Sequence, residues 1–140
     1  DKSKNKTDVP HDYVVLPKAI QARYIKMVNI HMPTGKFAIS GLRVFGKGTG
    51  ANPGTVQNFV PLRGDSERRN AWLKWAVNPN ATGYHIYFGN DPNKLYNSVM
   101  VYGVSEYYLN ALEKNDAYYF QIEAFNENGI GPRSPVMKAD

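Results

Sequence analysis

The chain has 140 residues, of which 42% are hydrophobic and 21% are charged, and its formal net charge at pH 7 is +5. This is enough apolar material for one packed domain of about 90 residues with a flanking segment. The chain has no cysteine, which excludes disulfide frameworks and thiolate metal sites. No apolar run approaches the roughly 18 residues of a membrane span, and no basic stripe of the kind that binds nucleic acid follows one element.

The first part of the chain divides into a leader, a β segment and a linker. Residues 1–12 are polar and unpatterned, as expected for a leader without regular structure. Proline and a Pro-Thr-Gly turn then separate three expected strands, at 13–16, 22–31 and 37–45. Residues 47–54 are rich in Gly and Pro, which predicts a flexible linker and a domain boundary.

Residues 55–140 are expected to form an all-β sandwich. Strand-like segments recur there at a spacing of about 8–12 residues, and turn-forming residues separate them. The expected strands are 55–62, 70–77, 83–89, 95–102, 105–110, 117–126 and 131–138. No helical period lasts more than one turn.

Alternation within these strands predicts which side chains are buried. In the second strand it places Leu73 and Trp75 on one face and Trp72 on the other. The same reasoning along the later strands completes the predicted core: Leu73, Trp75, Tyr84, Ile86, Leu112, Tyr118, Phe120 and Ile122.

Together with the run Gly129-Ile-Gly-Pro-Arg-Ser134, these residues resemble a fibronectin type III domain, from about Pro53 to Lys138. The resemblance implies a seven-stranded immunoglobulin-like sandwich with Trp75 at its centre. It also implies that Tyr118, six residues after Leu112, is a tyrosine corner whose hydroxyl bonds back to the backbone. It says little about function, because such sandwiches serve as spacers, binding modules and adhesion repeats.

The flank carries a second resemblance. Ala22-Arg-Tyr-Ile-Lys26 and Gly41-Leu-Arg-Val-Phe-Gly46 are similar to the closing strands of a discoidin-like jelly roll. With Pro10-His-Asp-Tyr13, they resemble segments downstream of the catalytic domain in family 43-like glycoside hydrolases of gut and soil bacteria. Residues 13–46 are therefore expected to be a small antiparallel part of a jelly roll. Its open edges would pair with each other, with the sandwich or with the rest of the parent protein.

The sequence offers no catalytic, metal or cofactor site. The carboxylates are dispersed, whereas a glycosidase needs two opposed carboxylates across a cleft. His11, His31 and His85 do not have metal-ligand spacing. The run Arg63-Gly64-Asp65-Ser66 spells an integrin-recognition tetrapeptide, although Gly and Asp are also expected there because of the turn.

Surplus aromatic residues are the main hint of a binding surface. Those predicted to face outward are Trp72, Tyr87, Tyr108 and Tyr119. Three roles remain open for them: cross-strand ladders that stabilise the sheets, packing against other domains of the parent, and contact with the apolar faces of sugar rings.

These observations predict a non-catalytic accessory or spacer module of a secreted multidomain bacterial glycoside hydrolase. It would hold or dock the catalytic and other domains, in the periplasm, at the cell surface or outside the cell. Because the chain starts at Asp1 without a signal-peptide pattern, we expect a fragment or a mature form. The alternative is a carbohydrate-binding module that uses exposed aromatics on plant polysaccharide. Neither hypothesis predicts a nucleic-acid partner.

Overall fold

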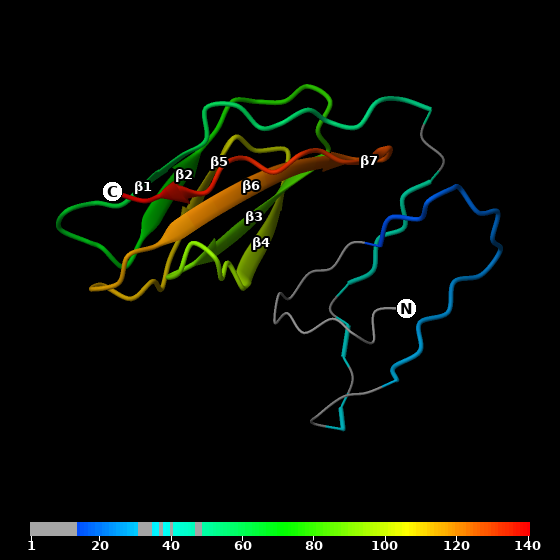
Figure 1. Ribbon diagram of the computed structural model, residues 1–140, viewed down its shortest axis with the longest axis horizontal. Helices are drawn as coiled ribbons and strands as arrows, with labels where there is room; N and C mark the ends of the chain where they lie inside the picture. The colour runs from blue at the N-terminus through cyan, green and yellow to red at the C-terminus, as the bar shows by residue number, and fades with distance from the viewer. Residues whose placement is uncertain (1–13, 31–34, 37, 40, 47–48) are drawn as a thin grey trace.

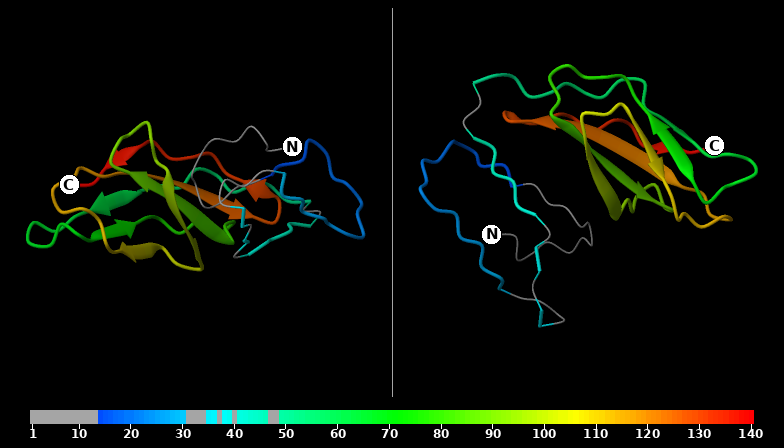
Figure 2. Two further views of the ribbon diagram at one scale, coloured as in Figure 1. Left: turned by 90° about the horizontal axis from the view of Figure 1, so that it is seen from below. Right: turned by 180° about the vertical axis from the view of Figure 1, so that it is seen from behind.

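The computed structural model describes residues 14–30, 35–36, 38–39, 41–46 and 49–140. Its strands form a sandwich of two antiparallel sheets (Figures 1 and 2). One sheet has the order β1 (Val60–Leu62), β2 (Ala71–Lys74), β5 (Glu106–Leu109). The other has the order β4 (Asn97–Tyr102), β3 (Gly83–Gly89), β6 (Tyr119–Asn126), β7 (Gly129–Ile130), and β8 (Met137–Lys138) also pairs with β6. The predicted all-β sandwich is confirmed.

The core lies between the two sheets. The inward residues of β2, β3 and β6 alternate with outward ones, so each strand contributes one apolar row. Each fully buried large side chain stabilises the fold by about 1.5–3 kcal/mol. Seven of the residues predicted from the sequence are buried, namely Leu73, Trp75, Tyr84, Ile86, Leu112, Phe120 and Ile122.

Tyr118 is partly buried against this cluster. Its hydroxyl accepts a hydrogen bond from the backbone N–H of Glu113, at 3.2 Å. The bond ties the start of β6 to the turn that follows Leu112 and so fixes the crossover between the two sheets. This is the geometry that the tyrosine-corner resemblance implies.

The last predicted strand, 131–138, is divided. Only Gly129–Ile130 and Met137–Lys138 form strands, and between them Pro132 and Pro135 lack the N–H donor that a ladder needs. The intervening residues still bond to β6, since Gly131 N donates to Ala124 O and Ser134 N to Ile122 O, both at 2.8 Å. The edge of the larger sheet is therefore continuous but not a single strand.

The N-terminal flank differs from the prediction. Among the described residues of 14–46 there is no strand, so the small antiparallel segment expected at 13–16, 22–31 and 37–45 is not formed there. Residues 14–30 run as an open trace beside the sandwich (Figures 1 and 2), and many of their apolar side chains are exposed. Two or three short strands without a sheet to join bury too little surface to hold a ladder. Residues 1–13 and 31 lie outside the described residues.

The chain enters and leaves the sandwich at opposite ends of its long axis (Figure 1). Residues 50–54 lie beside β7 at one end. At the other end the C-terminus lies beside the end of β1, where Arg63 N donates to Asp140 O at 2.8 Å. The points where the chain enters and leaves the sandwich are therefore far apart.

Candidate functional site

The outer side of the smaller sheet carries an exposed apolar row, which we call the Trp72 face. Its members lie across three strands in register: Leu62 of β1 pairs with Trp72 of β2, which pairs with Tyr108 of β5. Trp72 is 42% exposed and Tyr108 is 47% exposed. Val60 extends the row along β1 and is also exposed.

Polar partners hold the indole of Trp72 in place. Its ring meets that of Tyr108 edge to face, with centroids 5.4 Å apart. The indole N–H donates to Glu106 Oε2 at 3.2 Å, and Lys74 Nζ lies 5.1 Å from the ring centroid. A positioned aromatic ring beside a carboxylate and an ammonium group is suited to ligands with both apolar faces and hydroxyl groups.

The four outward aromatics predicted from the sequence do not form one array. Trp72 and Tyr108 lie together, but Tyr119 is half-buried on β6 of the other sheet. The prediction that Tyr87 is an accessible contact residue is wrong, because Tyr87 is only 5% exposed. It does project away from the sandwich core, but the outer side of its sheet is covered.

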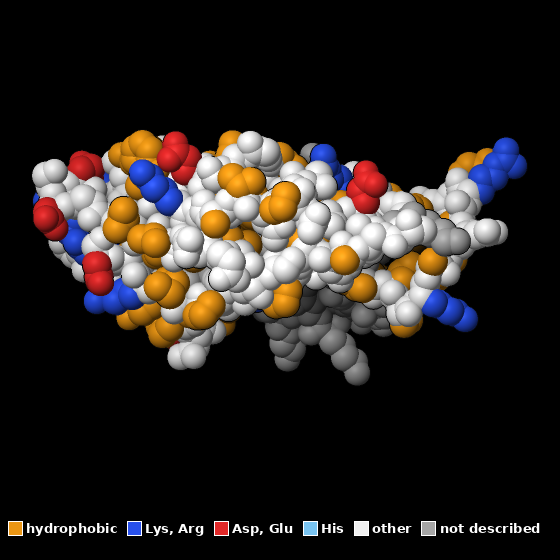
Figure 3. Space-filling view, turned by 90° about the horizontal axis from the view of Figure 1, so that it is seen from above, with side chains coloured by type: hydrophobic (Ala, Val, Ile, Leu, Met, Phe, Trp, Pro, Cys, Tyr) orange, Lys and Arg blue, Asp and Glu red, His pale blue; other side chains and the backbone are white. Residues whose placement is uncertain are grey.

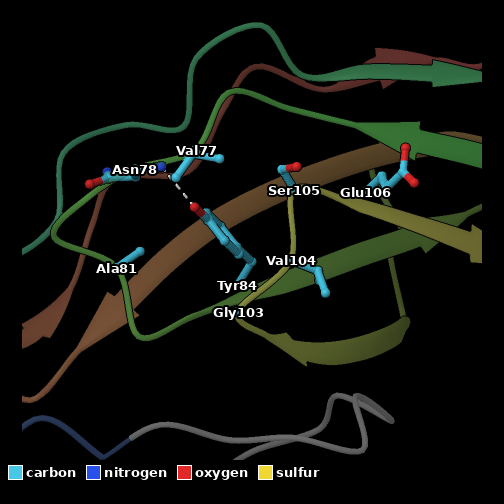
Figure 4. A pocket seen from close by; sticks show the side chains of 8 residues that line it. All are labelled: Val77, Asn78, Ala81, Tyr84, Gly103, Val104, Ser105 and Glu106. Carbon is cyan, nitrogen blue, oxygen red and sulfur yellow. Dashed lines mark hydrogen bonds between the residues drawn. The ribbon is translucent and has the colours of Figure 1, made fainter.

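A shallow cavity of about 390 Å³ lies at one end of the sandwich (Figure 4). The hydroxyl of Tyr84 forms part of its wall and accepts a hydrogen bond from Asn78 N at 2.9 Å. Glu106 contributes the only carboxylate of the lining, which is Val77, Asn78, Ala81, Tyr84, Gly103, Val104, Ser105 and Glu106. A single carboxylate does not supply the acid and base pair of a glycosidase.

The outer side of the larger sheet holds a buried polar cluster around Glu123 of β6. Its carboxylate is 4% exposed and receives Tyr87 O–H on Oε1 and Arg133 Nε on Oε2, both at 2.9 Å. His85 of β3 is fully buried, its ring centroid lies 4.1 Å from that of Tyr87 with the rings tilted, and its Nδ1 lies 3.5 Å from Glu123 Oε1. The guanidinium of Arg133 lies 4.0 Å from the Tyr87 ring centroid. We call these four residues the Glu123 cluster.

The electrostatics of this cluster favour a charged carboxylate. Burial by itself raises the pKa of Glu123. Hydrogen bonds from His85, Arg133 and Tyr87 lower it by a larger amount, so the pKa of Glu123 lies below its ordinary value. Burial lowers the pKa of Arg133, and the bond to Glu123 more than offsets this. Sequence reasoning missed the cluster, although a glutamate within the apolar run of β6 was the available signal.

An aromatic group adjoins the cluster on the same side of the sheet. Phe125 of β6 is fully buried and meets two rings edge to face: Tyr102 of β4 at 5.5 Å and Phe45 of the flank at 6.0 Å. Arg43, also from the flank, places its guanidinium 4.2 Å from the Tyr102 ring centroid. Residues 43–45 therefore pack on the outer side of the larger sheet.

The segment predicted as a flexible linker is bonded to the sandwich over its described part from Gly50. Asn126 Nδ2 donates to Ala51 O at 3.0 Å, Asn128 Oδ1 accepts from Gly50 N at 3.1 Å, and Asn52 Nδ2 donates to Ile130 O at 3.4 Å. Two asparagines of the β6–β7 hairpin thus supply the partners that the linker prediction did not anticipate. We call this set of contacts the asparagine joint.

The integrin-like tetrapeptide is not presented as a ligand. Arg63 is 4% exposed, and its guanidinium donates to the backbone carbonyls of Asp116, Glu113 and Arg68. Burial, and then the charge of Arg68, lower the pKa of this guanidinium. The arginine is therefore a structural residue that braces the loops at the C-terminal end of the sandwich.

No group of three or more His, Asp or Glu side chains in the described part of the chain could hold a metal ion. His85 belongs to the Glu123 cluster, and His11 and His31 lie outside the described residues.

Within the residues that the structure describes, no helix has the length and apolar character to cross a membrane. On the face drawn in Figure 3, acidic and basic side chains lie together toward the C-terminal end and the middle of the molecule, and the charged side chains at the end that bears the flank are basic.

Comparison with known proteins identifies the fold. No protein-family model and no curated protein matches the chain. Among solved structures, a variant of FN3tt is similar at 25% identity, with a TM-score of 0.53 over 64% of this chain and 93% of that one. A Fn3-like protein from Clostridium thermocellum is similar at 15% identity and TM-score 0.57, over 64% of this chain and 94% of that one. The FN5 domain of Drosophila Lar matches at 24% identity and TM-score 0.50, over 61% and 92%. The sandwich therefore has the fibronectin type III fold.

Proposed function

We propose that this chain is a non-catalytic spacer module of a secreted, multidomain bacterial glycoside hydrolase, where it holds neighbouring domains apart at a set distance. The observation that carries the proposal is the position of the two chain ends, at opposite ends of the long axis of the sandwich (Figure 1). The asparagine joint supports it, because bonded residues at the start of the module transmit orientation where a free linker would not.

The chemistry of the described surfaces agrees with a mechanical role. The cavity has one carboxylate, Glu106, which is exposed, and the buried carboxylate of Glu123 has donors on both oxygens. The hydrolase context rests on the similarity of residues 10–46 to segments downstream of family 43-like catalytic domains.

The first test measures the length and rigidity of the module. The chain has no cysteine, so Ala51→Cys and Asp140→Cys, both at exposed positions, accept a donor and an acceptor dye. A spacer gives one narrow distance distribution in buffer, and the same labelled chain in urea, as the control, gives a broad one. A broad distribution in buffer would reject a rigid spacer.

The second test addresses the hydrolase context. Residues 55–140 of the parent protein are replaced by a Gly/Ser segment with the same number of residues. We expect activity on polysaccharide to fall while activity on a small nitrophenyl glycoside stays unchanged, because only a polymer requires the domains to be held in a fixed relation. Equal activities on the polymer would contradict the proposal, as would glycosidase turnover by residues 1–140 alone.

The Trp72 face favours a second candidate, a carbohydrate-binding module. Trp72, Tyr108 and Glu106 combine an exposed aromatic ring with a hydrogen-bonding carboxylate. Isothermal titration with xylan and arabinan tests it. Binding that is lost in Trp72→Ala but kept in Tyr102→Ala, an exposed aromatic on the other sheet, would support a sugar site. A flat titration of the unaltered chain would exclude it.

A further inference from the structure

The outer side of the larger sheet is built like an interface. In a two-layer sandwich this side ordinarily faces water and carries polar residues. Here the outward residues His85 and Phe125 are fully buried, and Glu123 is 4% exposed. Exclusion of a carboxylate from water costs several kcal/mol unless hydrogen bonds compensate. The Glu123 cluster supplies those bonds, which is expected where a surface stays covered.

The segment that lies on this side is part of the same chain. Phe45 meets Phe125 of β6 edge to face, and Arg43 lies over Tyr102 of β4, so two side chains two positions apart contact the two strands on either side of β3. Between this contact and the sandwich, the asparagine joint fixes Gly50 and Ala51. Two separate sets of contacts therefore hold residues 43–45 and residues 50–51 against the sandwich.

We propose that the outer side of the β4–β3–β6 sheet is a docking surface for the unit that precedes the sandwich, and that Arg43 and Phe45 are its docking residues. This deepens the proposed spacer function, on which it rests: the module fixes the orientation of its N-terminal neighbour as well as its distance. The occupant is the flank of this chain, seated through residues 43–46.

The charge of the flank supports its docking on this sheet over a position free in solvent. Residues 14–46 contain no acidic residue and five basic ones, Lys18, Arg23, Lys26, Lys36 and Arg43. Of these, Arg43 is the one that the structure places on a ring of the sandwich. A guanidinium over an aromatic face is attracted by the negative charge of the ring face, and the attraction grows when water is excluded. Phe45, which is 38% exposed, adds an edge-to-face ring contact beside it.

The two sheets of the sandwich differ in this respect. Trp72 and Tyr108 on the smaller sheet remain exposed, whereas Tyr87 and Phe125 at outward positions of the larger sheet are buried. The proposal therefore distinguishes the two sides. A substitution on the larger sheet should loosen the flank, and a similar substitution on the smaller sheet should not.

Limited digestion of the full chain with trypsin tests the proposal. Trypsin cleaves after Arg43 in the docked region and after Arg23 in the exposed part of the flank, which provides an internal reference. The initial rate of each cut is measured by mass spectrometry. We expect the cut after Arg43 to be slower by about tenfold, the factor that corresponds to ~1.4 kcal/mol of docking free energy.

Two matched variants assign the protection. Tyr102→Ala removes a ring that contacts both Arg43 and Phe125 without altering the sequence around the cleavage site, and we expect it to abolish the protection. Tyr108→Ala removes a tyrosine of similar exposure from the other sheet, and the protection should remain. Circular dichroism checks that both variants keep the folded sandwich. Arg43→Lys keeps the tryptic site but lacks the planar guanidinium, so it should accelerate the cut even if Tyr102→Ala fails to fold.

Three results would overturn the proposal. Equal rates after Arg43 and Arg23 in the unaltered chain would show that the flank is not seated. Equal acceleration by Tyr102→Ala and Tyr108→Ala would show a general loss of stability. Protection that grows with protein concentration would assign the surface to a second copy of the chain. None of these outcomes touches the distance between positions 51 and 140, so the spacer proposal stands or falls separately.

Discussion

Arg63→Lys should destabilise the sandwich even though it preserves the charge. The guanidinium donates through Nη1 to Asp116 O at 2.5 Å and through Nη2 to Glu113 O at 2.9 Å and to Arg68 O. It also lies 5.2 Å from the ring centroid of Tyr118. Three carbonyl groups from two loops thus converge on one planar donor group.

The magnitude follows from the number of bonds that lysine cannot replace. An ammonium group on a flexible stem is a point charge and does not reproduce the planar fork of arginine. If it retains one of the three bonds, two charge-assisted bonds are lost, at about 1.5–3 kcal/mol each. The loops lie at the surface, so water recovers part of this loss, and we expect a net cost of ~2–3 kcal/mol.

Urea unfolding followed by tryptophan fluorescence measures this cost. The midpoint should fall while the slope of the unfolding free energy against urea stays constant, because the surface exposed on unfolding is unchanged. Arg69→Lys is the matched control, since the Arg69 side chain is exposed, and it should leave the midpoint within about 0.5 kcal/mol of the unaltered chain. If Arg63→Lys behaves like this control, the buried guanidinium does not brace the loops and the reasoning is wrong.

Four further substitutions test the fold and the Glu123 cluster. In urea, Trp75→Ala should cost about 3–5 kcal/mol because it empties the centre of the core, whereas Trp72→Ala should cost less than about 1.5 kcal/mol. Gly131→Ala should lower the melting temperature measured by circular dichroism, because a Cβ there would lie 2.4 Å from Pro53 O; an unchanged value would mean that the backbone yields freely. Since the pKa of Glu123 is lowered in the folded state, its contribution is present above the unfolded value of about 4.3 and lost as pH falls through the folded value. Glu123→Gln should therefore make stability fall less steeply below about pH 4.3, and parallel curves for the two proteins would refute the role of the carboxylate.

The alternation of apolar and polar side chains along each strand predicted the core, because the side of the sheet on which a residue lies depends on local sequence. Trp75 and Trp72 are three residues apart and differ in burial because an odd separation along a strand reverses the side of the sheet. The same rule located Leu73, Ile86 and Ile122, and the spacing between Leu112 and Tyr118 located the corner tyrosine. Strand pairing follows from these rows, since each one must meet another apolar row across the core.

The rule failed at Tyr87 because it describes one side of a sheet at a time. It placed Tyr87 correctly on the side opposite Ile86 but said nothing of what covers that side. That information lies in contacts between distant parts of the chain, such as Phe45 with Phe125, and local periodicity does not report such contacts. The sequence nevertheless holds a trace of them. Glu123 and Phe125 lie on the same outward side of β6. An apolar ring at an outward position, next to a carboxylate that is paired with an arginine, is typical of a surface that is covered by another segment.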